Sequence, residues 1–136
     1  MCKLGDIIVV KQFKNEEGNI VSKHSFVVIN DEPDFVQGLK YDFVSNMMCS
    51  FHSKIHKTKK LKYKENLLVK EGYLSGDKIN NKEGYIKADQ LYYFNKKRIK
   101  YKVIAHMDDE LLDELVKIIL ILHDNNKIKM VTDNLQ

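Results

Sequence analysis

Near its end, the chain carries aliphatic residues at the spacing of an α-helix. They recur every three or four positions, at Leu111, Leu115, Ile118 and Leu122, and neighbouring aliphatic residues widen the stripe. Asp108 stands where a helix N-cap would accept a hydrogen bond from a free backbone N–H group. We therefore predict one helix that ends at residues 124–126. Its apolar stripe must pack against the rest of the domain or against a second subunit.

The earlier two-thirds of the chain predicts strands separated by polar turns. Runs rich in β-branched, aromatic and other apolar residues span 7–10, 26–29, 39–49, 67–69, 85–94 and 101–105. Segment 14–19 contains Asn and Gly, which tolerate positive φ, and it predicts a turn after the first strand. We assign the aromatic residues 92–94 to the core. Several short strands joined by turns favour a closed barrel over a parallel α/β sheet.

The composition is that of one globular domain. The chain has 136 residues, of which 43% are hydrophobic and 31% charged, so its apolar content exceeds that of disordered chains. We predict a domain over residues 1–123 and a mobile C-terminal tail over 124–136. The formal net charge of +4 favours an anionic partner.

The same residues exclude several other classes. Cys2 and Cys49 do not form a disulfide framework, and no paired Cys/His spacing indicates zinc. The longest apolar run, 118–122, is too short to span a bilayer, and the first residues lack the apolar core of a signal peptide. We expect a cytoplasmic protein without metal or cofactor. His106, Asp108 and Asp109 are better explained by the start of the last helix than by a metal site.

Five segments occur in a recognisable order along the chain. They are Gly5-Asp6-Ile7-Ile8, Lys23-His24-Ser25-Phe26-Val27-Val28-Ile29-Asn30-Asp31, Gly84-Tyr85-Ile86-Lys87-Ala88-Asp89-Gln90-Leu91, Lys97-Arg98-Ile99 through Val103-Ile104, and His106-Met107-Asp108-Asp109-Glu110-Leu111-Leu112-Asp113. In this order, the chain resembles the MazF/PemK family of toxin endoribonucleases from about residue 5 to 122. The resemblance implies a mainly β fold, a small SH3-like barrel with a C-terminal helix. It also implies a metal-independent endoribonuclease, a homodimer and a cognate antitoxin protein as partner.

The resemblance also points to candidate catalytic residues. Lys23 stands where the family has an arginine that is important for RNA cleavage, and His24 replaces the following proline. A lysine ammonium is a point charge, so it would hold phosphate less directionally than a guanidinium. His24 titrates near neutral pH, but it would share a site with Lys23 only if both lay in a loop, because adjacent strand residues face opposite ways. The family also places a serine or threonine hydroxyl after its third strand. Ser50 is the best match to that residue, and Ser45 is the alternative.

A lysine-rich stretch gives evidence for nucleic acid that is independent of the resemblance. Residues 54–64 contain six lysines, flanked by Phe51 and Tyr63, which could neutralise phosphates and stack on bases. The predicted RNA-binding residues are Lys54, Lys57, Lys59, Lys60 and Lys62. Unpaired RNA is the expected target because its bases are open to recognition.

Two readings from other classes stay open. The same barrel could hold RNA or a protein without cutting it, or it could serve a phage or mobile element as an interaction protein. The leading hypothesis remains an endoribonuclease that leaves a 2′,3′-cyclic phosphate and a 5′-hydroxyl.

Overall fold

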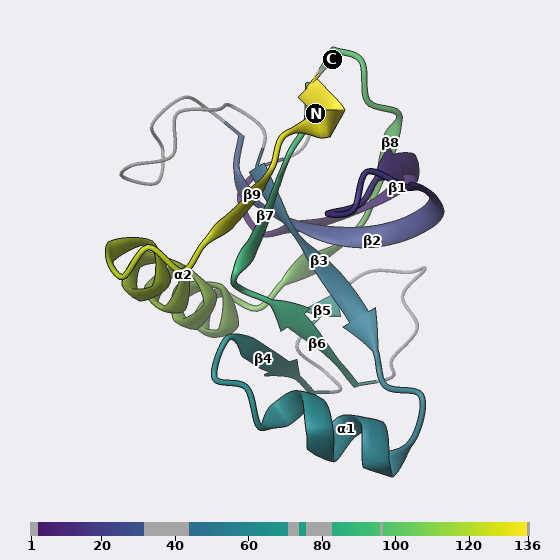
Figure 1. Ribbon diagram of the computed structural model, residues 1–136. Coiled ribbons are helices and arrows are strands. Elements are labelled where there is room, and N and C mark those ends of the chain that lie inside the picture. The colour runs from purple at the N-terminus through teal and green to yellow at the C-terminus, as the bar shows by residue number, and fades with distance from the viewer. Residues whose placement is uncertain (1–2, 32–43, 71–73, 76–82, 96, 136) are drawn as a thin grey trace.

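The computed structural model describes residues 3–31, 44–70, 74–75, 83–95 and 97–135 (Figure 1). The strands are β1 (Asp6–Lys14), β2 (Ile20–Asn30), β3 (Val44–Ser50), β4 (Asn66–Val69), β5 (Leu74–Ser75), β6 (Gly84–Lys87), β7 (Gln90–Tyr93), β8 (Tyr101–Met107) and β9 (Lys129–Val131). The helices are α1 (Lys54–Leu61), α2 (Asp109–Asp124) and a 3₁₀ turn, η1 (Asp133–Leu135). The predicted third strand is described only from Val44 onward, since residues 39–43 lie outside the described ranges.

The sheet is mainly antiparallel, as the strand and turn pattern predicts. Its strands follow the order β4-β6-β3-β2-β1-β8-β5, with β7 paired to β3 and, in parallel, to β9. Among the described residues, no pairing joins β4 back to β5, so the strand order is that of an open sheet. The prediction of a mainly β domain with a C-terminal helix is confirmed.

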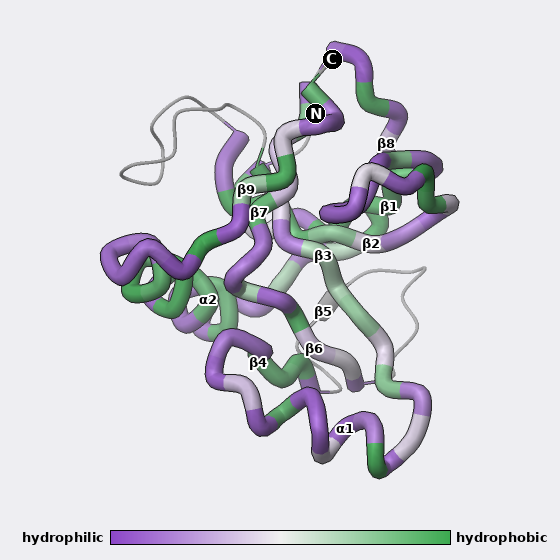
Figure 2. Tube along the Cα trace, viewed as in Figure 1, coloured by the Kyte–Doolittle hydropathy of each residue, from purple (hydrophilic) through white to green (hydrophobic). Residues whose placement is uncertain are grey.

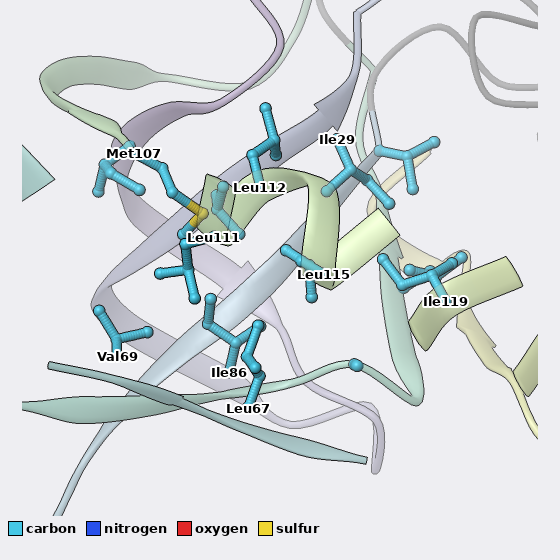
Figure 3. Close-up of a cluster of buried hydrophobic side chains, with 14 of the residues drawn as sticks. Ile29, Leu67, Val69, Ile86, Met107, Leu111, Leu112, Leu115 and Ile119 are labelled. Carbon is cyan, nitrogen blue, oxygen red and sulfur yellow. The ribbon is translucent and has the colours of Figure 1, made fainter. Parts of the chain in front are cut away.

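Central strands bury apolar side chains on both faces. Alternate residues of β1, β2 and β7 divide between two clusters, so that Ile7 and Val27 lie in one while Ile8 and Val28 lie in the other. The first cluster packs under α2, which contributes Leu111, Leu112, Leu115 and Ile119 (Figure 3). The second contains four buried aromatic residues, and Phe26 meets Phe13 and Phe94 edge to face. Residues 92–94 are buried, as predicted.

Strands β6 and β7 correspond to the single strand predicted over 85–94, with an interruption in the middle. Met48 pairs with Ile86 and Ser45 with Tyr92, so the register along β3 shifts between these pairs. The amide of Asn46, buried between them, donates to the carbonyl oxygens of Lys87 and Gln90, both at 3.0 Å. This side chain satisfies the carbonyl groups that the interruption removes from the ladder.

Helix α2 begins and ends where the apolar stripe predicts, but its N-cap differs. Asp108 is the N-cap residue, yet its side chain makes no capping hydrogen bond. Its backbone carbonyl accepts from the amide of Leu112 at 3.0 Å instead. The predicted role of the Asp108 carboxylate in capping is therefore wrong.

Two further segments differ from the predicted pattern. The lysine-rich stretch forms α1, which begins after Ser53, whose hydroxyl accepts from the amide of His56. This helix buries no residue and is mostly hydrophilic, which explains why no apolar stripe signalled it (Figure 2). Residues 124–136, predicted to be a mobile tail, add β9 to the sheet and bury Val131.

Packing of α2 on the sheet should dominate stability. Replacing the fully buried Leu115 by Ala should lower the free energy of unfolding by about 2–5 kcal/mol, because it removes apolar contacts and leaves a cavity. Ile121→Ala on the same helix is the control; since Ile121 is 62% exposed, it should cost less than about 1 kcal/mol. Chemical denaturation measures both. Equal losses would contradict the assignment of Leu115 to the core.

Candidate nucleic-acid interface

Lys23 lies in β2 and lines a surface hollow of about 710 Å³. Three other lysines line it, one from β1, one from β8 and one just before β8, together with an apolar floor. The lining residues are Val9, Lys11, Lys23, Ile99, Lys100, Tyr101, Lys102 and Ile104. We call this site the lysine hollow. None of the described residues that line it is acidic.

Strand register brings these lysines together. Val10 pairs with His24 and Gln12 with Ser22, so Lys11 lies opposite Lys23 across β1 and β2. Lys102 pairs with Val9 on the other side of β1, and Lys100 precedes it by two residues, just before β8 begins. Like charges directly opposite one another destabilise a sheet. Within the described chain, Lys11, Lys23 and Lys100 form no ion pair, so an anionic ligand would relieve their repulsion.

Ser50 lies at the exposed end of β3, on the same face as Lys23. Phe26 pairs with Met47, and extending this register by three residues aligns Lys23 with Ser50. Pairing between the two strands stops before that point, so the register fixes the face and not a contact. The rival Ser45 is fully buried, and its hydroxyl has no hydrogen-bond partner among the described residues. Of the two serines, only Ser50 is accessible to RNA.

His24 lies on the opposite face of β2. Its Nε2 atom is 2.7 Å from the carbonyl oxygen of Met48, and its ring meets Phe13 and Phe26 edge to face. Because a carbonyl only accepts, Nε2 carries the hydrogen. Burial, with a smaller contribution from the nearby ammonium of Lys87, lowers the pKa of His24. The structure therefore does not place Lys23 and His24 in one site, since both are strand residues.

The five predicted RNA-binding lysines of the α1 region are not equivalent. Lys54, Lys59 and Lys62 are exposed. Lys57 forms an ion pair with Glu83 and lies 5.9 Å from the centre of the Phe51 ring. Lys60 is partly buried and lies near the thiol of Cys49. The three exposed lysines are open to a polyanion, whereas Lys57 is engaged with Glu83 and Lys60 is partly covered by the domain.

Cys49 is a partly buried free thiol of β3. It shares a side-chain hydrogen bond with Tyr85, whose ring stacks on Phe51 at 5.1 Å. Burial raises the pKa of Cys49, and it raises the pKa of Tyr85 to about 12. Both groups therefore stay protonated at neutral pH, and Phe51 is stacked against the domain.

His106 is engaged in a contact that holds the start of α2. Its Nδ1 atom lies 3.0 Å from Oδ1 of the buried Asp6, and its Nε2 atom lies 3.8 Å from Asp109. The other oxygen of Asp6 accepts from the amide of Lys3 at 2.9 Å. Across the described ranges, no group of three or more His, Cys, Asp or Glu residues could hold a metal ion.

Sequence reasoning missed Lys11, Lys100 and Lys102. Their signal is Lys100-Tyr101-Lys102, where lysines alternate at the period of a strand and so share one face. Recognising their proximity to Lys23 required the pairing of β1 with both β2 and β8.

No protein-family model, curated protein or solved structure matches this chain. None of the helices among the described residues combines the length and apolar character needed to cross a bilayer.

The half-buried position of His24 makes stability depend on pH. Its pKa in the folded domain lies below the ordinary value of about 6.5, so the unfolded chain binds a proton first as pH falls. Its contribution is fully present above that value and is lost as pH falls through the lowered pKa. Between pH of about 7 and 5, the free energy of unfolding should fall less for His24→Gln than for the wild type, as measured by denaturation at each pH. Parallel curves would contradict this account.

Proposed function

We propose that this domain binds single-stranded RNA and cleaves it without a metal ion. The observation that carries the proposal is the lysine hollow, in which Lys11, Lys23 and Lys102 from three strands converge with Lys100, just before β8, and none of the described lining residues is acidic. Such a surface suits the regularly spaced charges of a sugar–phosphate backbone. Ser50 is exposed and lies on the same face as Lys23, so an RNA backbone that leaves the hollow on this face could continue toward Ser50 and the start of α1.

The chemistry requires few protein groups. The RNA's own 2′-hydroxyl attacks the adjacent phosphorus, and the bond from phosphorus to the 5′-oxygen breaks. A 2′,3′-cyclic phosphate and a 5′-hydroxyl result, as the 2′-oxygen loses a proton to solvent and the 5′-oxygen gains one. Lys23 would stabilise the charge that develops on the phosphoryl oxygens, and the Ser50 hydroxyl would donate to one of them.

We propose that the underlying fold is the MazF/PemK-type SH3-like barrel. We also propose that the domain forms a homodimer in the cytoplasm and that its partner is an antitoxin protein. Support comes from the five motif segments and from their places in the structure. Asp6 begins β1, the Lys23 segment forms most of β2, and the last segment leads from β8 into α2.

One observation favours a second candidate, RNA binding without cleavage. His24, the expected proton-transfer group, lies on the face of β2 opposite the lysine hollow. Among the described residues that line the hollow there is no imidazole or carboxylate. A binding module would need only the cations.

Cleavage should depend on Lys23 and not on His24. In EDTA, with a long unstructured RNA, Lys23→Gln should slow cleavage by about 100-fold or more, since it removes a cation that stabilises the transition state. Ser50→Ala should slow it by about tenfold. His24→Gln should retain the wild-type rate within about threefold. Gel analysis with end-group assignment measures rates and 5′-hydroxyl products.

Lys117→Gln, on the exposed face of α2, controls for loss of charge. Loss of cleavage in His24→Gln with retention in Lys23→Gln would move the reaction to the other face. Intact RNA with all proteins, together with a salt-sensitive band shift, would support the binding module.

RNA affinity should show which lysines contact phosphate. Lys11→Gln combined with Lys100→Gln should reduce the slope of log affinity against log salt by about 1.4, since each of the two lost phosphate contacts on a single strand contributes about 0.7. Lys54→Gln with Lys59→Gln tests the predicted α1 contacts in the same way. The control pair, Lys70→Gln with Lys117→Gln, carries the same charge change at exposed positions elsewhere. A pair that leaves the slope at its wild-type value does not belong to the interface.

A further inference from the structure

A second hollow lies between the segment that follows α1 and the C-terminal half of α2. Its volume is about 530 Å³, within the range of ligand sites, roughly 300–1,000 Å³. The lining residues are Lys62, Tyr63, Lys64, Glu65, Ile118, Ile121, Leu122, Asn125 and Lys127. In Figure 1, the connection from α1 to β4 lies beside α2. We call this site the α1–α2 groove.

The floor of the groove is aliphatic and partly uncovered. Helix α2 buries Leu115 and Ile119 against the sheet, whereas Ile121 turns away from that core and is 62% exposed. Ile118 and Leu122 pack at the edge of the core and also line the groove. Across the groove, Tyr63 is 58% exposed. Large apolar side chains exposed side by side in a concave surface indicate a binding site.

The rim of the groove is basic. Lys62 and Lys64 come from the segment after α1, and Lys127 comes from the turn after α2. Glu65 is the one carboxylate among the described lining residues. Neither these lysines nor Glu65 form an ion pair within the described chain. The groove therefore presents an aliphatic floor inside a ring of excess positive charge.

The aliphatic floor and basic rim together favour an acidic peptide over unpaired nucleic acid as the anionic partner. Unpaired nucleic acid binds on aromatic platforms, where successive bases stack, and the groove offers one aromatic ring beside three aliphatic residues. An acidic peptide with aliphatic or aromatic side chains satisfies both features, since its apolar groups cover Ile121 and its carboxylates meet the lysines. A second copy of this chain would bring further basic charge, given the net charge of +4.

We propose that the α1–α2 groove binds an acidic segment of a partner protein, anchored by apolar side chains against Ile121 and Tyr63. The site is separate from the lysine hollow, with which it shares no lining residue. The inference does not depend on RNA cleavage.

A displayed library of random dodecapeptides tests this directly. Peptides that the wild-type protein selects and Ile121→Ser does not should carry net negative charge and at least two large apolar residues. A peptide selected in this way should bind Ile121→Ser at least about tenfold more weakly by fluorescence anisotropy, as expected when an apolar anchor is lost. Lys62→Gln with Lys127→Gln should weaken binding and reduce its salt dependence.

The matched control is Ile55→Ser, which removes an isoleucine that is 70% exposed on α1 and outside the groove. It should bind the selected peptide with wild-type affinity. Circular dichroism checks that each variant keeps its fold.

Three results would overturn the proposal. Identical peptide selection by the wild type and Ile121→Ser would show that the groove is not the binding site. Weakened RNA binding in Ile121→Ser, with no selected peptides, would make it a nucleic-acid surface. A wild-type dimer that Ile121→Ser converts to a monomer in light scattering would show that a second copy covers it.

Discussion

Burial of apolar side chains on both faces of the central strands is the constraint on which this structure depends. Ile7 and Ile8 are adjacent in β1, yet one packs under α2 and the other in the aromatic cluster. Each buried aliphatic side chain of this size contributes about 1.5–3 kcal/mol, so neither face can be left uncovered. Helix α2 covers one face, and the aromatic side chains of β1, β2 and the β7 segment fill the other.

The same alternation places the cations. On the face of β1 that α2 covers, Ile7 is buried, Val9 is partly exposed and Lys11 is exposed. This face of the strand therefore changes from core to basic surface within four residues. On β2 the corresponding series runs from Val27 through Ser25 to Lys23. Lys11 and Lys23 of the lysine hollow therefore lie on the same sheet face as the core under α2, past the residues that α2 covers. His24, one residue from Lys23, belongs to the aromatic side for the same reason.

The sequence predicted the elements whose signals are local. Aliphatic spacing located α2, β-branched runs located β1 and β2, and Asn15 with Gly18 located the turn between them. That turn follows the expected chemistry, since Asn15 accepts from the amides of Glu17 and Asn19 and Gly18 has a φ of 80°. Helix α1 was not predicted because it buries no residue, so it has no apolar stripe. Strand β9 was not predicted because it has only three residues, which pair with β7.

The candidate site was only partly predictable because it is assembled by pairing. Lys23 and Ser50 were found through motif position. Lys11 and Lys100 lie far from each other in the chain, and only register brings them beside Lys23. The separation of Lys23 from His24 followed from strand geometry once both were known to lie within β2.

We propose that RNA binds over the lysine hollow of β1, β2 and β8. The most direct measurement is a titration of the isotopically labelled domain with a short unstructured RNA, followed by amide chemical shifts in NMR spectra. The account predicts that the largest shifts cluster at Lys11, Lys23 and Lys100 and continue to Ser50. Shifts confined to the His24 side of the sheet, or absent from β1 and β2, would contradict it.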